Sequence, residues 1–249
     1  MTVVLVPIYK PRPDALELVS MDVSLAALKG RRIIFIGPAH MDIGAYAARY
    51  DGIEYMGFDA SHFASIPGYN RLLLQPAFYE MFAPHEFMLI LQTDAVVLKD
   101  ELDHWCRQPF DYVGAPWPLP YELFVNLDRF AGAHGRHVRA TVGNGGLSLR
   151  RLAKCAALLR EFPQAIDFFL RSGSSEDLYF SVFGQLSVDF ALPNEITASK
   201  FALEMQPSYY YEVNGRQAPM GGHAWWKHEP GFWTQRLPPT VALPALHAA

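Results

Sequence analysis

The sequence predicts an α/β protein with a central, mostly parallel sheet flanked by helices and an irregular C-terminal half. In the first half, apolar strand-like runs alternate with helix-like segments, which is typical of βαβ units. The strand candidates are short and almost continuously apolar, as strands buried on both faces are. With 249 residues, of which 51% are hydrophobic, the chain is long enough to bury one sizeable core. We therefore expect a single domain over residues 1–236, followed by a Pro-rich tail over 237–249.

The elements of the first half are predicted more clearly than those of the second. Apolar runs predict strands at 3–6, 32–36, 53–56 and 87–92. Helix-like segments between them predict helices at 16–28 and 71–81. After a Pro- and aromatic-rich stretch that begins at Tyr112, we expect a strand at 146–149, a helix at 152–160 and another helix from about Ser174. From Gln206 onward, aromatic residues and prolines predict loops and short strands that cover the core.

Charge and cysteine content narrow the class of protein. With 21 basic and 25 acidic residues, the net charge of −4 offers no electrostatic reason to bind nucleic acid or an anionic membrane. Cys106 and Cys155 are far apart and lack the spacing of a metal site, which fits a reducing compartment. No run reaches the roughly 20 apolar residues of a spanning helix, and no basic residues precede the apolar N-terminus. We expect a cytoplasmic protein without a transmembrane segment.

A single carboxylate, Asp94, interrupts an apolar run that extends from residue 86 to 98. Burying an unpaired carboxylate costs several kcal/mol, so Asp94 is expected at the carboxyl end of a strand. Open α/β sheets bind ligands at that edge, where a carboxylate suits a divalent metal or a ribose hydroxyl. The alternative is an acid that caps the following turn.

The expected first strand ends in Pro7, Ile8 and Tyr9, without the glycine-rich turn of a dinucleotide-binding or phosphate-binding loop. That absence disfavours an NAD-dependent oxidoreductase. Pro7 stiffens the turn, and Tyr9 offers a ring that can stack on a nucleotide base. Covering the edge of the sheet is the alternative role of Tyr9.

Three glycines surround Asn144 in the segment 143–146, directly before an apolar strand. Glycine is required where the backbone adopts positive φ or where another group approaches it closely. The run can therefore bring main-chain amides against a sugar or a phosphate. A simple tight turn is the alternative, although a hairpin needs fewer glycines.

Two adjacent acids, Glu176 and Asp177, open a helix-like stretch. An ionised carboxylate at hydrogen-bond distance can accept the proton of an attacking hydroxyl, and position alone does not choose between the two. A capping box between Ser174 and Asp177 would explain both acids without catalysis.

A histidine, His223, follows two glycines and precedes two tryptophans. It can ligate a metal through a neutral ring nitrogen, with the glycines letting the loop close over the site. A buried, hydrogen-bonded histidine is the alternative. His228 is a weaker candidate, because Lys227 and Glu229 on either side of it indicate a solvated position.

Seven motifs follow one another along the chain: Pro7–Tyr9, Gly68–Arg71, Gln92–Ala95, Asp111–Trp117, Gly143–Arg150, Glu176–Asp177 and Gly222–Trp225. In this order they resemble a bacterial and fungal domain family of unknown function that is similar to GT-A glycosyltransferases. The resemblance extends from about residue 3 to Trp233. The resemblance implies a GT-A-like (Rossmann-like) fold and a hexosyltransferase-like enzyme. Its donor would be a nucleotide-sugar, a UDP-sugar by expectation, and its acceptor an oligosaccharide, a lipid-linked glycan or another hydroxyl compound in polysaccharide biosynthesis.

The resemblance also implies a metal site. GT-A enzymes bind a divalent cation and the donor diphosphate with an Asp-x-Asp element at the end of a central strand. Asp94 resembles the surviving acid of that element, whereas Gln92 occupies the place of the first acid. Mn²⁺ or Mg²⁺ would then be held by Asp94 and His223, together with diphosphate oxygens and water.

The remaining roles follow from the same resemblance. Asp177 is expected to be the catalytic base of an inverting single displacement, with Glu176 orienting an acceptor hydroxyl or capping the helix. Trp117 and Trp225 are expected to pack on sugar rings. Contacts to the nucleotide or donor are expected from Pro7, Tyr9, Asn70, Arg71, Gln92, Thr93, Asp94, Asn144, Gly145 and Gly146.

Two other functions remain open at the level of the sequence. One is a protein of the same fold that binds nucleotide or carbohydrate without transferring it, which the missing first acid would permit. The other is a glycoside hydrolase, which needs two carboxylates about 5–10 Å apart across the scissile bond. Adjacent Glu176 and Asp177 do not supply that spacing, although Asp94 could partner one of them.

Overall fold

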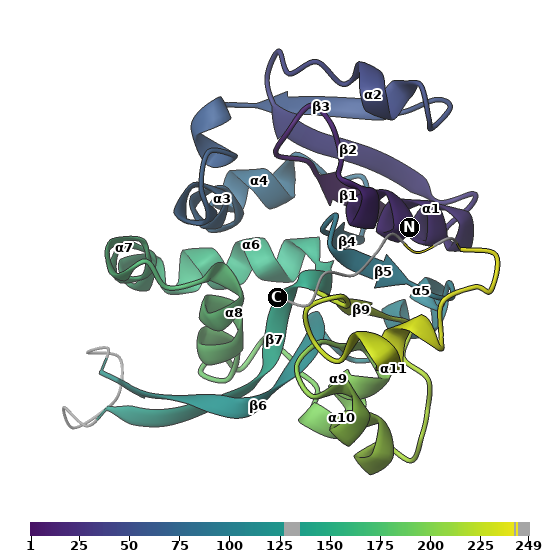
Figure 1. Cartoon of the computed structure of the whole chain (residues 1–249). Coiled ribbons are helices and arrows are strands. Elements are labelled where there is room, and N and C mark those ends of the chain that lie inside the picture. Colours follow the sequence, from purple (N-terminus) through teal and green to yellow (C-terminus); the bar gives the residue numbers. More distant parts are fainter. Residues whose placement is uncertain (127–134, 242, 244–249) are drawn as a thin grey trace.

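A six-stranded sheet forms the centre of the computed structural model, which describes residues 1–126, 135–241 and 243 (Figure 1). Its strands lie in the order β3-β2-β1-β4-β7-β6. They are β1 (Thr2–Pro7), β2 (Arg32–Pro38), β3 (Glu54–Phe58), β4 (Phe87–Leu91), β6 (Tyr112–Val125) and β7 (Arg136–Arg151). The strands β3, β2, β1 and β4 are parallel to one another, whereas β7 is antiparallel to both of its neighbours, β4 and β6. The predicted α/β class with a mostly parallel sheet is confirmed.

Helices pack on both faces of this sheet (Figure 1). The helices of the described residues are α1 (Ala15–Ala27), α2 (Gly44–Ala47), α3 (Ile66–Leu73), α4 (Pro76–Glu80), α5 (Leu102–Cys106), α6 (Leu152–Glu161), α7 (Pro163–Ser172), α8 (Glu176–Gly184), α9 (Glu195–Phe201), α10 (Pro207–Val213), α11 (Pro230–Thr234) and the 3₁₀ turn η1 (Ala60–His62). Of these, α10 and α11 pack in a separate cluster with Val96 and Leu203. On β1, Val3 and Leu5 face the core that α3, α4 and α6–α8 cover. Val4 and Val6 face the opposite core with α1 and α5. This double burial explains why the parallel strands are almost continuously apolar.

A second, three-stranded sheet lies beside the first. β5 (Ala95–Val97) pairs antiparallel with β9 (Gly221–His223), which pairs parallel with β8 (Ala202–Leu203). In this register Ala95 lies opposite His223. The pairing therefore brings the turn after β4 next to a residue that is more than a hundred positions away in the sequence.

Several predicted elements differ from the observed ones. The helix expected at 71–81 is two helices, α3 and α4, because Pro76 starts a new helix and cannot continue the previous one. The Pro-rich stretch after Tyr112 forms the long strand β6, which lies at the edge of the sheet, where missing amide donors are tolerated. Beyond Gln206, where loops and short strands were expected, the chain also forms α10 and α11.

The described part of the expected C-terminal tail folds back on the protein. Leu237 is buried in a cluster with Val19, and the Val241 amide donates to the Pro238 carbonyl. Residues 242 and 244–249 of the tail lie outside the described residues. Among the described residues, no helix combines the length and the apolar character needed to cross a bilayer.

Candidate active site

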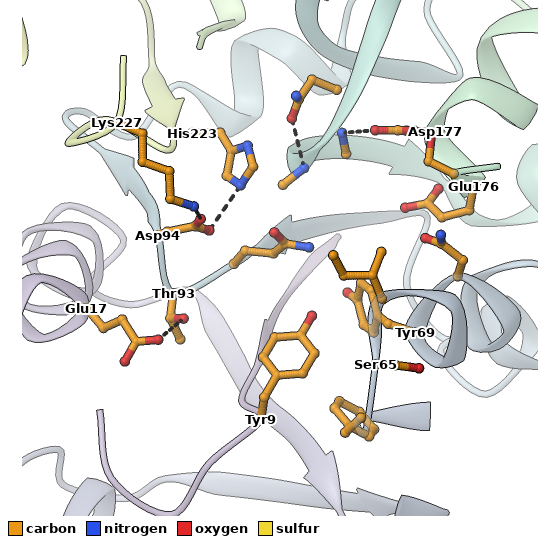
Figure 2. A pocket seen from close by; sticks show the side chains of 18 of the residues that line it. Tyr9, Glu17, Ser65, Tyr69, Thr93, Asp94, Glu176, Asp177, His223 and Lys227 are labelled. Carbon is orange, nitrogen blue, oxygen red and sulfur yellow. Dashed lines mark hydrogen bonds and ion pairs between the residues drawn. The ribbon is translucent and has the colours of Figure 1, made fainter. Parts of the chain in front are cut away.

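A cavity of about 700 Å³ opens at the carboxyl ends of β1 and β4. Open α/β sheets commonly bind ligands at this edge. Tyr9 reaches the cavity from the end of β1, and Gln92, Thr93 and Asp94 reach it from the turn after β4. Figure 2 shows Glu17 and Thr93 at one end of the site and Glu176 and Asp177 at the other. The expectation that Asp94 follows a buried strand is confirmed.

The Asp94 carboxylate binds two cationic side chains from the segment that begins at β9 (Figure 2). Its Oδ1 lies 3.0 Å from His223 Nε2, and its Oδ2 accepts a hydrogen bond of 3.0 Å from Lys227 Nζ. The other ring nitrogen of His223, Nδ1, lies 3.2 Å from Oε1 of Glu204, which directly follows β8. His223 is thus held between two carboxylates.

These contacts shift the pKa values of both partners. Burial raises the pKa of Asp94, but the hydrogen bond from His223 and the charge of Lys227 outweigh it, and the pKa lies well below its usual range. Burial lowers the pKa of His223, but the carboxylates of Asp94 and Glu204 raise it to about 10. Without a ligand, the Asp94 carboxylate is therefore ionised and the His223 ring is protonated at neutral pH.

The glycine run packs directly against this histidine. A Cβ atom at Gly146 would lie 2.2 Å from His223 Nε2, so only glycine lets the imidazole lie on the backbone at this point. Asn144, Gly145 and Gly146 all line the cavity, as the sequence predicted. Contact of this backbone with a sugar remains a prediction.

Asp177 reaches the cavity from the first turn of α8. Its Oδ2 accepts a hydrogen bond of 3.0 Å from the Gly145 amide, and its Oδ1 accepts one of 2.7 Å from the Leu178 amide. Burial raises the pKa of Asp177, and these amides, together with the Ser175 side chain, only partly offset that increase. Asp177 is thus a fixed carboxylate whose proton affinity is higher than that of a solvated aspartate.

The neighbouring acid, Glu176, has a different environment. Its carboxylate binds the fully buried Arg150 guanidinium through two hydrogen bonds of 2.9 and 3.2 Å. Arg150 also donates to Tyr79 Oη and Ser148 Oγ and lies over the Tyr112 ring. Glu176 therefore neutralises the buried Arg150 cation, and its carboxylate is not free to act as a base. The capping box between Ser174 and Asp177, which was the alternative explanation of the two acids, is absent, because α8 begins one residue later with Ser175 as its N-cap residue.

Some predicted site residues do not line the cavity. Arg71 is exposed on α3, and Pro7 ends β1 within the sheet. Trp117 is 6% exposed and packs behind Gly143. Trp225 is fully buried, and its Nε1 donates to Ser20 Oγ over 2.8 Å, which contradicts the sugar-stacking role expected for it. Of the predicted donor contacts, those that do line the cavity are Tyr9, Asn70, Gln92, Thr93, Asp94, Asn144, Gly145 and Gly146.

Comparison with protein families places the chain in a family. Residues 52–223 match DUF5672, which is described as a protein of unknown function. The chain belongs to the DUF5672 family. A search of curated proteins found no match.

Solved structures resemble this DUF5672 protein in fold. The galactosyltransferase LgtC in complex with donor and acceptor sugar analogs superposes with a TM-score of 0.55 at 17% identity, over 98% of each chain. Mouse xyloside xylosyltransferase 1 in its apo form gives a TM-score of 0.52 at 10% identity, over 90% of this chain and 97% of that one. The expected GT-A glycosyltransferase fold is confirmed.

The DUF5672 chain also brings to the site side chains that the sequence did not single out, among them Trp226, Lys227, Glu17 and Glu204. Trp226 and Lys227 line the cavity next to the predicted His223, although Lys227 was interpreted only as a sign of solvation. Glu17 lines it from α1, where a capping box with Asp14 accounts for its place in the sequence. Glu204 follows a strand of two residues, which is too short to produce a recognisable pattern.

Proposed function

We propose that this protein is a glycosyltransferase that moves a sugar from a nucleotide-sugar donor to a hydroxyl acceptor. One observation carries the proposal: the cluster of Asp94, His223 and Lys227 and the Asp177 carboxylate open onto the same cavity of a glycosyltransferase fold. The cluster offers groups that bind a diphosphate, and Asp177 offers a base. We expect a UDP-sugar as the donor and an oligosaccharide or a lipid-linked glycan as the acceptor.

Lys227 is the side chain best suited to the diphosphate. Its ammonium carries three donors, of which Asp94 takes one, and its side chain is 55% exposed. The remaining donors can therefore bind phosphate oxygens. Asp94 fixes the position of the ammonium, so that the positive charge is in place before the donor arrives.

Asp94 and His223 also fit a divalent cation, provided that the cation brings oxygen ligands with it and displaces the proton from His223 Nε2. Among the described residues, no three His, Cys, Asp or Glu side chains are grouped to hold a metal on their own. Mg²⁺ and Mn²⁺ in nucleotide sites, however, are often bound by one or two protein groups together with substrate phosphates. Asp94 Oδ1 and His223 Nε2 lie 3.0 Å apart, and Glu204 stands at the other nitrogen, as carboxylates do behind metal-bound histidines. When bound, the cation supplies Lewis-acid neutralisation of the departing diphosphate.

In the proposed single displacement, Asp177 accepts the proton of the acceptor hydroxyl while the hydroxyl oxygen bonds to the anomeric carbon. The bond between that carbon and the diphosphate oxygen breaks, and the nucleoside diphosphate leaves with the bonding electrons. Lys227 stabilises the negative charge that develops on the leaving group. Glu176 is bound to Arg150, and Asp94 is bound to His223 and Lys227. Neither carboxylate is therefore free to pair with Asp177 as a glycoside hydrolase requires.

Calorimetric titration with UDP and GDP, each with and without Mn²⁺, tests the proposal. We expect one of them to bind, and Mn²⁺ to strengthen its binding. Incubation with the matching nucleotide-sugars and oligosaccharide acceptors should then release nucleoside diphosphate and give a product of inverted anomeric configuration by NMR. Binding without any turnover would favour an inactive binding protein, and the absence of nucleotide binding would contradict both functions.

Asp94→Asn is expected to weaken nucleoside diphosphate binding by about tenfold or more in the presence of Mn²⁺. The substitution removes the charge that holds Lys227 and His223 in the cavity. Calorimetry on the variant measures the change, and Asp51→Asn, at an exposed position, is the matched control. An Asp94→Asn protein that binds as tightly as the wild type would show that Asp94 has no role in donor binding.

Glu204→Gln is expected to lower Mn²⁺ affinity by about 10-fold to 100-fold, because His223 loses the carboxylate that orients it. Thermal stability should fall only slightly, because the variant loses the charge that faces the protonated His223, whereas Oε2 of Glu204 is buried without a hydrogen-bond partner among the described residues. Mn²⁺ titration followed by EPR, and a melting curve, report the two effects separately. Unchanged Mn²⁺ affinity would leave Glu204 with a packing role alone.

A further inference from the structure

We propose that Glu17 and Thr93 bind the ribose hydroxyls of the donor, so that the protein selects ribonucleoside diphosphate sugars over deoxyribonucleoside ones. The inference rests on the proposed function, because it uses the positions assigned to the diphosphate and to the transferred sugar. It adds a site for a vicinal diol at the end of the cavity opposite Asp177 (Figure 2).

Direct contacts order the groups along the cavity. At one end, Thr93 Oγ donates a hydrogen bond of 2.9 Å to Glu17 Oε1, and Thr93 directly precedes Asp94. Asp94 binds His223 and Lys227, where the diphosphate is proposed to lie.

From His223 the contacts continue to the other end of the cavity. The His223 ring packs on Gly146, and the amide of the adjacent Gly145 donates to Asp177. A donor with its diphosphate in the middle and its sugar at Asp177 therefore has its nucleoside at Glu17 and Thr93.

The hydrogen bonds of Glu17 leave one acceptor position free. Its Oε2 accepts from the Asp14 amide over 2.8 Å and lies 2.8 Å from Lys10 Nζ, which occupies both lone pairs of that oxygen. Its Oε1 accepts only from Thr93 among the described residues. The capping box of α1 needs Oε2 alone, so helix capping does not explain the contact of Oε1 with Thr93, and both residues line the cavity.

The free acceptors match a diol. Because the Thr93 hydroxyl proton is given to Glu17, Thr93 Oγ also presents a lone pair, and two acceptors then lie 2.9 Å apart. The two hydroxyls of a ribose donate to such a pair, as ribose does to acidic residues in other α/β sheets. A guanine edge would instead need both carboxylate oxygens, and Oε2 is occupied.

The test combines ligand and protein changes in one cycle. UDP, GDP, ADP and CDP and their 2′-deoxy and 3′-deoxy forms are titrated into the full-length protein, into Glu17→Gln and into Thr93→Val. Gln at this position still supports a capping box, and Glu101→Gln, which removes another lysine-paired carboxylate outside the cavity, is the matched control. Melting curves confirm that each variant is folded.

For the ribonucleotide that binds the wild type, we expect removal of a ribose hydroxyl to weaken binding by about tenfold or more. In Glu17→Gln, removal of the same ribose hydroxyl should weaken binding by less than about threefold, because the variant already lacks the carboxylate oxygen that accepts from it. Equal affinity for ribo and deoxy forms in the wild type, or an undiminished loss in Glu17→Gln, would overturn the inference and leave the proposed function standing. Failure of all four ribonucleotides to bind would overturn the proposed function, and this inference with it.

Discussion

Replacing Asp177 by asparagine is expected to lower the rate of glycosyl transfer by about 100-fold to 10,000-fold, the usual contribution of a positioned general base. Asparagine has the same shape but cannot accept a proton from the acceptor hydroxyl. The affinity for nucleoside diphosphate should not change, because Asp177 lies at the opposite end of the cavity from Glu17 and Thr93 (Figure 2). Initial rates and calorimetry on the same preparation separate the two effects.

Thermal stability serves as the internal check on Asp177→Asn. Burial raises the pKa of Asp177, so its protonated form is favoured in the native state, and this contribution to stability is lost as pH rises through the raised pKa. At neutral pH the buried carboxylate of Asp177 is ionised at a cost to stability, and a neutral asparagine avoids this cost. Asparagine, however, satisfies only one of the two amides that the carboxylate binds. The two changes offset each other, and the melting temperature should move by no more than about 2–4 °C, the shift that about 1 kcal/mol produces in a domain of this size. Asp167→Asn, at an exposed site on α7, is the control.

The pH dependence of transfer follows from the same shift. Because the base must be ionised, the rate should fall on the acid side through a pKa above the ordinary range of aspartate. Initial rates between about pH 4 and 8, at saturating donor, measure this limb, because the range extends from ordinary to strongly raised carboxyl pKa values. Full activity of Asp177→Asn, or a rate that does not depend on pH in this range, would remove the role assigned to Asp177.

Replacing Arg150 by methionine is expected to destabilise the protein by about 3–5 kcal/mol, because Glu176 would be left buried without its counter-charge. Both side chains are almost inaccessible, with 0% of the Arg150 and 6% of the Glu176 side chain exposed. Arg150 also supplies hydrogen bonds to Tyr79 and Ser148, which methionine cannot make. The urea midpoint measures the loss.

A double variant separates the charge from the packing. In Arg150→Met/Glu176→Gln the buried charge is gone, so the urea midpoint should return part of the way to that of the wild type. If the double variant is no more stable than Arg150→Met, the guanidinium acts through packing rather than by neutralising Glu176. If Arg150→Met unfolds at the wild-type midpoint, the ion pair contributes nothing to stability.

Particular elements show how far the sequence alone can predict this fold. The strands β1, β2 and β4 follow from their apolar runs, since a strand buried on both faces has no polar alternation to confuse the pattern. The three prolines of β6, at 116, 118 and 120, argue against a strand until its neighbours are known. β6 lies at the edge of the sheet, and only that position makes the prolines acceptable.

The candidate site shows the same division. The sequence predicted Asp94 after a buried strand, the glycine run and His223, because each is a chemical exception within its own segment. The sequence did not predict which of two adjacent residues lines the cavity. Trp226 lines the cavity, whereas Trp225 is buried in the core.

By itself, the sequence determined the α/β class, the parallel strands and the segments that supply the site, because hydrophobic patterns and glycine requirements are local properties of the chain. Only the tertiary structure decided the partners: Arg150 for Glu176, Thr93 for Glu17, and Glu204 and Asp94 for His223. Arg150 and Glu176 are 26 residues apart in the sequence, and Asp94 and His223 are 129 residues apart. Their contacts depend on strand register and helix packing, and no local pattern encodes which distant charge a buried side chain will meet.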